Sequence, residues 1–224
     1  MDPVNIIILL SVLSLLPLIA VICTSFLKIS VVLLFLRESL ALQAIPPNVV
    51  IYGMSLILSV YTMGPVCNQI SDELNTLEYY SQQKINPDSG QNAIPKFSDI
   101  AGKVALPLKE FLNANASNES KLYFNNALTK MWKQQYTNQI KKDDMLILIP
   151  SFMVTQLNEA FKLGFLLYLP SLVIDIFISN LLLALGMMMM SPTTISTPVK
   201  LLLFILAGGW TKVVNLLLHS FVIN

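Results

Sequence analysis

Charged side chains that interrupt apolar segments are the residues of this sequence whose types and spacing could do chemistry. They are Lys28, Glu159, Lys162, Asp175 and Lys212. A charge at the centre of a bilayer costs at least about 2.5 kcal/mol, so such a group faces protein, water or an opposite charge. One interpretation is a pathway for ions or protons, and the other is ion pairs that fix the register of helices. A relay needs several titratable groups in series, so the structural interpretation is favoured.

The spacing of these charges suggests their partners. Glu159 and Lys162 are three residues apart, which places them on one face of a helix, within reach of each other. Asp175 has no basic residue near it in sequence, so we expect Lys28 or Lys200 to pair with it, from elsewhere in the chain or from another chain. Lys28, Glu159, Lys162 and Asp175 are therefore the predicted buried and intersubunit charges.

A run of four methionines, Met187 to Met190, follows Gly186 and precedes a segment marked by Pro192 and Pro198. Methionine is unbranched and polarisable, so it re-packs easily in irregular space. Because successive helix residues point in different directions, four methionines in a row cannot all face one core. One interpretation is a compliant seal, built where several chains bring this loop together, with the glycine allowing a bend and the prolines fixing the loop. The other is a helix end that faces lipid.

Motifs of common enzymes are missing from the sequence. There is no phosphate-binding Gly-x-x-x-x-Gly-Lys-Ser/Thr loop, no dinucleotide fingerprint, no His/Cys metal cluster and no Gly-x-Ser-x-Gly elbow. The net charge of +1 provides no electrostatic attraction for nucleic acid. We therefore expect no enzyme activity, no cofactor, no metal and no nucleic-acid partner.

The elements that position these residues are expected to be membrane helices. The chain of 224 residues is 54% hydrophobic and only 12% charged, whereas a soluble domain carries about 25% charged residues. Residues 3–27 and 39–71 contain no charge, and either stretch exceeds the roughly 20 residues that span a bilayer. The first helix is expected to continue to about Arg37, and prolines then break the chain. A second helix should run from Asn48 or Val49 to Gly64–Pro65, so residues 1–66 form a hairpin.

Residues 67–144 form a polar insert, with 9 of the 14 basic and 9 of the 13 acidic residues of the chain. Helical spacing of apolar residues appears three times there, at 70–77, 97–111 and 124–136. Residues 145–224 are apolar again. We expect a broken helix from Met145, with an amphipathic part to about Lys162 and a buried part to Met190. A last helix from Lys200 to Ile223 should bend at Gly208–Gly209.

The expected fold is therefore all-α and of the integral membrane type, with two long helical hairpins, four potential spans and a polar helical insert. The two tight turns, after residue 37 and after residue 190, carry Arg37 and Lys200, which favours the cytoplasmic side for both turns and the periplasmic side for the insert.

Several motifs in the apolar ends of the chain resemble the SctR/FliP family, the membrane core proteins of type III secretion and flagellar export gates. The motifs occur in order at 26–30, 43–48, 148–152, 160–170, 183–192 and 209–210. The similarity covers roughly residues 10–66 and 146–222 and does not extend over the insert. The lack of an obvious extra targeting sequence is more typical of the injectisome branch than of the flagellar one.

This resemblance implies a pore-forming export-gate subunit in the bacterial inner membrane. Several copies would join smaller membrane subunits in a helical, closed-tip assembly that sits partly above the bilayer plane and passes unfolded polypeptides. Met187 to Met190 would be the pore gasket. Phe161, Phe165 and Pro170 would pack and set the register between subunits. The alternative is a small-solute or ion transporter that uses Lys28 and Asp175 as coupling groups. It predicts an internal repeat, which the two hairpins do not show, and it leaves the methionines unexplained.

Overall fold

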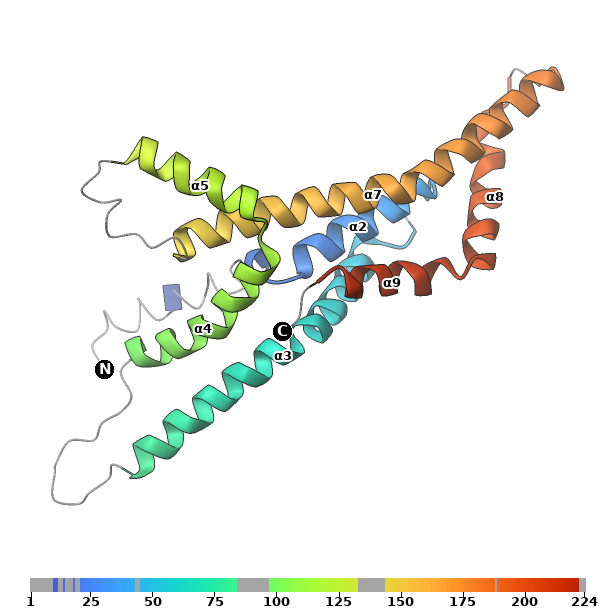
Figure 1. The fold of residues 1–224 in the computed structure, drawn as a ribbon. Coiled ribbons are helices and arrows are strands. Elements are labelled where there is room, and N and C mark those ends of the chain that lie inside the picture. The colour runs from blue at the N-terminus through green and yellow to red at the C-terminus, as the bar shows by residue number, and fades with distance from the viewer. Residues whose placement is uncertain are drawn as a thin grey trace. The chain divides into compact units, whose positions relative to one another are not determined.

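The computed structural model describes residues 10–11, 14, 18, 21–42, 45–83, 97–132, 144–187 and 189–221. The regular elements in these ranges are helices (Figure 1): α2 (Phe26–Ser39), α3 (Asn48–Gln83), α4 (Phe97–Asn115), α5 (Asn118–Met131), α7 (Met145–Ala184), α8 (Pro192–Leu206) and α9 (Gly209–His219). The prediction of an all-α membrane-type protein is thus confirmed.

Two helices in the described part of the chain are long and apolar enough to cross a membrane. They are Asn48–Glu73 within α3 and the whole of α7, and α8 with α9 counts as a third if a bent pair forms one span. At 1.5 Å per residue the 40 residues of α7 extend about 60 Å, twice the bilayer core of about 30 Å. The predicted first span lies largely outside the described residues.

The chain forms two compact units. One contains Met1–Cys23, Val60–Thr155 and Val222–Asn224, and the other contains Thr24–Ser59 and Gln156–Phe221. The predicted division at 66 and 144 stays a prediction.

The second unit begins with the turn that precedes α2. Our prediction of one unbroken helix to Arg37 is wrong, because the helix is interrupted at Thr24 and Ser25. The Thr24 hydroxyl accepts a hydrogen bond from the N–H of Phe26 (3.3 Å), and Ser25 Oγ donates to Ser59 Oγ (3.1 Å). Hydroxyl groups that bond to nearby backbone compete with the helical pattern in this way.

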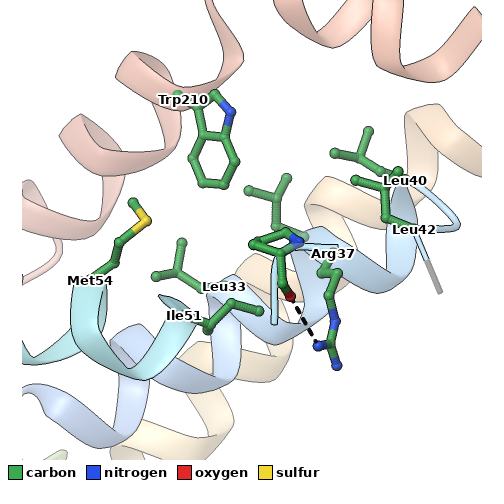
Figure 2. Close-up of a pocket in the computed structure, with 9 residues that line it drawn as sticks. Leu33, Arg37, Leu40, Leu42, Ile51, Met54 and Trp210 are labelled. Atoms are coloured by element: carbon green, nitrogen blue, oxygen red, sulfur yellow. Dashed lines mark hydrogen bonds between the residues drawn. The ribbon is translucent and has the colours of Figure 1, made fainter. Parts of the chain in front are cut away.

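Prolines 46 and 47 separate α2 from α3 as predicted, and α3 starts at Asn48. Arg37 at the end of α2 donates hydrogen bonds across this turn to the Pro46 carbonyl (3.5 Å; Figure 2) and to Asn48 Oδ1 (2.5 Å). The predicted end of the second helix is wrong, since α3 passes through Pro65 and continues to Gln83. Proline removes one helical hydrogen bond and crowds the preceding turn, a local cost that the other backbone bonds of this 36-residue helix outweigh.

The predicted break in the third apolar segment is also absent. α7 is continuous from Met145 to Ala184 and contains Pro150 and Pro170. The part of α7 expected to be buried is mostly exposed in the isolated chain, and it ends before the methionines. Burial of that part therefore requires lipid or another chain.

The first unit contains the insert helices α4 and α5, which confirm the second helical pattern and most of the third. Its described core joins Phe111 and Leu112 of α4 to Ile147, Leu148 and Phe152 of α7. The rings of Phe111 and Phe152 lie 5.7 Å apart. The first pattern is part of α3, and the end of the third pattern, residues 133–136, lies outside the described residues.

Helices α8 and α9 meet at the predicted glycines with a bend of 66° (Figure 1). Gly208 has a φ of +63°, which a residue without a Cβ adopts freely. A Cβ on Gly209 would overlap the Phe204 ring, which packs edge-on against Trp210 (5.6 Å between centroids). The last helical segment was expected to begin near Lys200. Helix α8 begins at Pro192 instead, so it is longer than expected.

Candidate functional site

The methionine run lies in the turn between α7 and α8. Met187 and Met190 are 40% and 41% exposed, and Met189 is fully exposed. Met188 lies outside the described residues. In the isolated chain the described methionines of this turn are thus left for a partner chain, a lumen or lipid.

Gly186 ends α7 in a left-handed conformation, with a φ of +74°. The N–H of Gly186 donates to the Leu183 carbonyl (3.1 Å), and the N–H of Met187 donates to the Leu182 carbonyl (3.0 Å). This pair of bonds is the Schellman arrangement, which satisfies the last carbonyls of a helix. Because a side chain with a Cβ is strained at this φ, the glycine determines where the helix stops and the methionine turn begins.

The two prolines after the methionines have different positions. Pro192 is the first residue of α8, where its missing N–H interrupts no helical bond. The prediction that Pro198 fixes a loop is wrong, since Pro198 lies inside α8. Its restricted φ is compatible with a helix, so the cost is one hydrogen bond and local crowding.

An ion pair joins α7 and α8, the two helices on either side of the methionine turn. Nζ of Lys200 on α8 lies 2.5 Å from Oδ2 of Asp175 on α7, and the side chains are 4% and 36% exposed. Nine residues separate Asp175 from the end of α7 at Ala184, and eight separate Lys200 from Pro192. At 1.5 Å per residue both charges stand about 12–14 Å from the turn. Of the two partners expected for Asp175, Lys28 and Lys200, the structure shows Lys200, from the same chain.

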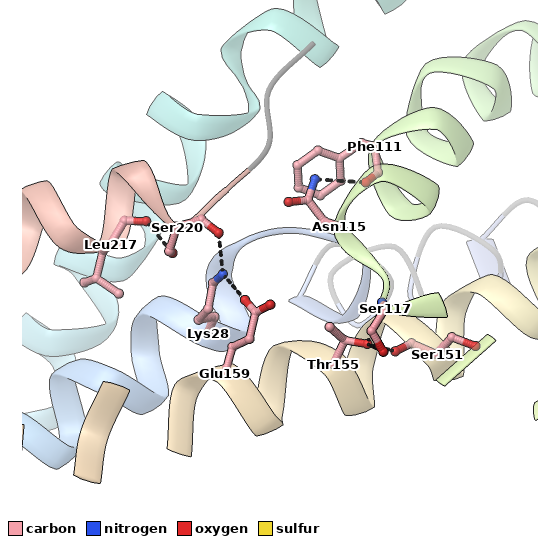
Figure 3. Close-up of polar contacts among 9 residues, drawn as sticks. All are labelled: Lys28, Phe111, Asn115, Ser117, Ser151, Thr155, Glu159, Leu217 and Ser220. Atoms are coloured by element: carbon pink, nitrogen blue, oxygen red, sulfur yellow. Dashed lines mark hydrogen bonds and ion pairs between the residues drawn. The ribbon is translucent and has the colours of Figure 1, made fainter. Parts of the chain in front are cut away.

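A second ion pair lies between α2 and α7 (Figure 3). Nζ of Lys28, whose side chain is fully buried, lies 2.7 Å from Oε2 of Glu159, which is 42% exposed. Lys28 also donates to the Ser220 carbonyl at the end of α9 (3.0 Å) and lies 3.8 Å from the centre of the Phe221 ring. One ammonium group thus connects α2, α7 and the end of α9.

The family model described as "FliP family" matches residues 9–217. The chain belongs to the FliP family. It is 43% identical over 220 residues to "Virulence protein YscR" of Salmonella typhimurium and 42% identical over 220 residues to "Yop proteins translocation protein R" of Yersinia pestis. It is 37% identical over 220 residues to "Harpin secretion protein HrcR" of Erwinia amylovora. Each similarity covers 98% of this chain and 97% of the relative.

One predicted pair of this FliP-family chain is wrong. Glu159 pairs with Lys28 and not with Lys162, although helical spacing allows the latter. Lys162 is exposed, and it has no ion pair with any residue that the structure describes. A buried ammonium gains more from a carboxylate than an exposed one does, so the contact across helices is preferred to the contact along one helix.

The predicted packing residues are mostly exposed in the single chain. Phe165 is 64% exposed and Pro170 is exposed, so their proposed contacts between subunits stay a prediction. Phe161 is 54% exposed, but its ring packs edge-on against Phe35 of α2 (5.5 Å between centroids). A Cβ on Gly164 would lie 2.6 Å from the same Phe35 ring. The close approach of α2 and α7 therefore depends on this glycine, a role that the sequence motif did not reveal.

A hydroxyl cluster in the first unit was also not predicted. Thr155 Oγ1 on α7 accepts from the N–H of Ser117 (3.0 Å) and donates to the Ser151 carbonyl (2.7 Å; Figure 3). Ser117 caps α5 by accepting from the N–H of Ser120 (3.2 Å). A serine just before a helical pattern is a signal for such a cap, but the partner on α7 is distant in sequence.

Among the residues that the structure describes, no group of three or more His, Cys, Asp or Glu side chains could hold a metal ion.

Proposed function

We propose that this chain is a pore-forming subunit of a type III secretion export gate in the bacterial inner membrane. The printed names of its relatives, which speak of secretion, translocation and virulence, support this proposal. So do helices long and apolar enough to cross a membrane. We assign the chain no catalytic step, since the energy for transport would come from another subunit or from the membrane potential.

The observation that carries the proposal is the exposed methionine turn between α7 and α8, two helices that the Asp175–Lys200 ion pair joins. A seal around an unfolded polypeptide must adapt to side chains of every size. Methionine has three rotatable bonds and a polarisable sulfur, so it can re-pack around each of them. Several copies would bring Met187 to Met190 together as the gasket, while Gly186 and the Asp175–Lys200 pair hold the turn in place.

The partners we propose follow from the exposed apolar surface of α7. Further copies of this chain and smaller membrane subunits would cover Phe161, Phe165 and Pro170, and Lys162 would meet a partner charge. The insert would lie on the periplasmic side, and the assembled complex would sit partly above the bilayer plane. Secreted unfolded polypeptides are the proposed cargo.

A transporter of small solutes is the less favoured function. That hypothesis uses Lys28 and Asp175 as free coupling groups, whereas each of them has its own partner of opposite charge in this chain. A coupling group must exchange protons or ions with water, and in each pair the ammonium is buried and already neutralised by its carboxylate, which opposes such exchange.

An ion-leak assay in cells that make the assembled gate tests the proposed gasket. We expect replacement of Met187 to Met190 by alanine to raise the leak, because four long side chains are shortened while the helices remain. Replacement by leucine should raise it less, since the volume is kept but the compliance is lost. The control is Met131→Ala, which shortens an exposed methionine (80%) at the end of α5. Unchanged leak and secretion in the alanine variant, with normal assembly, would refute the gasket.

A further inference from the structure

Helices α8 and α9 meet at an elbow that has very little linking chain (Figure 1). Two residues, Ala207 and Gly208, join the end of α8 to the start of α9. The N–H of Ala207 donates to the Leu203 carbonyl (2.9 Å), and the N–H of Gly208 donates to the Ile205 carbonyl (3.0 Å). Because each residue has only two soft backbone torsions, the angle of the elbow depends on a few torsions, and a change in one of them turns α8 as a whole.

The side chain of Phe204 packs into this elbow. Phe204 lies in the last turn of α8, and its ring rests against the backbone of Gly209, where a Cβ would overlap it. The ring of Trp210 meets the Phe204 ring edge-on, with 5.6 Å between the centroids and 83° between the planes, an arrangement that aromatic rings favour. One side chain of α8 thus lies against two consecutive residues at the start of α9. A change of the elbow angle displaces the ring from these contacts.

The two helices are attached to the rest of the second unit in different ways. α9 buries apolar side chains there, with Val213 3% and Leu217 0% exposed. The buried residues of α8 are both polar, Ser196 and Lys200. Since buried apolar contacts are what makes a segment locally stable, α9 is the firm base. In this chain α8 depends on its pair with Asp175 and on its two ends, the methionine turn and the elbow.

We propose that Phe204 and Trp210 are positioning residues, which together with Gly209 set the elbow angle and thereby the place of the methionine turn. The 15 residues of α8 extend about 22 Å. A rotation of about 10° at the elbow would therefore move the far end of α8 by about 4 Å, the distance over which apolar side chains are in contact. The part of α7 that leads to the turn is mostly exposed, so it can follow α8. The effect on a seal rests on the proposed gate function, whereas the effect on the position of α8 does not.

The distance between two spin labels, measured by double electron–electron resonance, tests whether these residues position α8. One label replaces the exposed Thr194 beside the methionine turn, and the other replaces Leu216 on α9. The two native cysteines are first removed by Cys23→Ala and Cys67→Ser. The full-length protein is reconstituted in lipid and diluted with unlabelled protein, so that only distances within one chain contribute.

Phe204→Ala and Trp210→Ala should each broaden the distance distribution. The mean should shift by about 3 Å, which corresponds to a change of about 20° from the bend of 66° for helix arms of about 21 and 12 Å. Trp210→Phe keeps an aromatic ring beside Phe204 and should retain the distance. Gly209→Ala should shift it, because the added Cβ displaces the Phe204 ring, so the test stands even if Phe204→Ala fails to fold. The control is Leu202→Ala, which shortens an exposed side chain of α8 (58%) outside the elbow and should change nothing.

An ion-leak assay of the same variants, in cells that make the assembled gate, tests the consequence for the seal. The leak should rise with Phe204→Ala and Trp210→Ala but not with Trp210→Phe. An unchanged distance in folded Phe204→Ala and Trp210→Ala proteins would overturn the proposal, whatever the leak. A shifted distance with a normal leak would overturn the role in the seal while the gate function stands, if replacement of Met187 to Met190 by alanine does raise the leak. If that replacement has no effect either, the seal itself is refuted, and the distance alone decides whether the two rings position α8.

Discussion

For the Lys28–Glu159 pair, we predict that removing the carboxylate destabilises the fold more than removing the ammonium does. Lys28 is fully buried and Glu159 is 42% exposed, although they belong to the same ion pair. Removing the carboxylate by Glu159→Met leaves a buried ammonium with only the Ser220 carbonyl and the Phe221 ring. Removing the ammonium by Lys28→Met leaves a carboxylate that can reach solvent.

The two single variants should therefore lose different amounts of free energy of unfolding. Breaking a buried pair costs about 3–5 kcal/mol, and the partial exposure of Glu159 places this case at the lower end, about 3 kcal/mol or a hundredfold in the unfolding equilibrium. Lys28→Met loses chiefly one hydrogen bond to a carbonyl, about 1–2 kcal/mol. The double variant should resemble Lys28→Met, because no charge is then left buried.

Unfolding midpoints in dodecyl sulfate, followed by circular dichroism of the purified full-length protein, measure these differences. Lys162→Met, which removes an exposed cation one turn further along α7, is the control and should shift the midpoint little. The reasoning is refuted if Lys28→Met is the more harmful single change, or if the double variant is no more stable than Glu159→Met.

Three further predictions concern backbone and packing. Gly164→Ala should lower the free energy of unfolding by about 1–3 kcal/mol, because its Cβ would overlap the Phe35 ring, and Phe35→Leu should recover part of the loss in the same assay. Gly186→Ala should cost about 1–2 kcal/mol and increase proteolysis at the methionine turn, because φ is +74° there, whereas Gly53→Ala in the open part of a helix should be neutral or stabilising. Thr155→Val should leave a backbone N–H at the start of α5 without its acceptor and cost about 1–3 kcal/mol, seen as faster amide hydrogen exchange in α4 and α5.

The helical architecture was predictable from the sequence because composition and apolar spacing determine it. The positions at which helices begin and end were less predictable from the sequence. Pro46 and Pro47 lie in the turn between two helices, whereas Pro65, Pro150 and Pro170 lie inside helices. The local rule is the same for all five, so whether a helix continues past a proline depends on the bonds and contacts of the surrounding structure, which the local sequence does not show.

Partners within the site were predictable only in part. Asp175 was expected to pair with Lys28 or Lys200, and Lys200 is its partner. Glu159 pairs with Lys28 because burial, which the sequence does not show, makes that contact the more favourable one. The role of Gly164 depends on its close approach to Phe35 of a helix distant in sequence, so no local pattern indicates it.

Cross-linking at the methionine turn would test the proposed conduit most directly. A photoreactive residue replaces Met189, or Met131 as the control, in cells whose secreted cargo carries a folded domain that stalls it in the gate. The conduit hypothesis predicts a cross-link to stalled cargo from position 189 and none from position 131. Absence of a cross-link from position 189 while the stalled cargo blocks secretion would contradict it, because the polypeptide would then pass elsewhere.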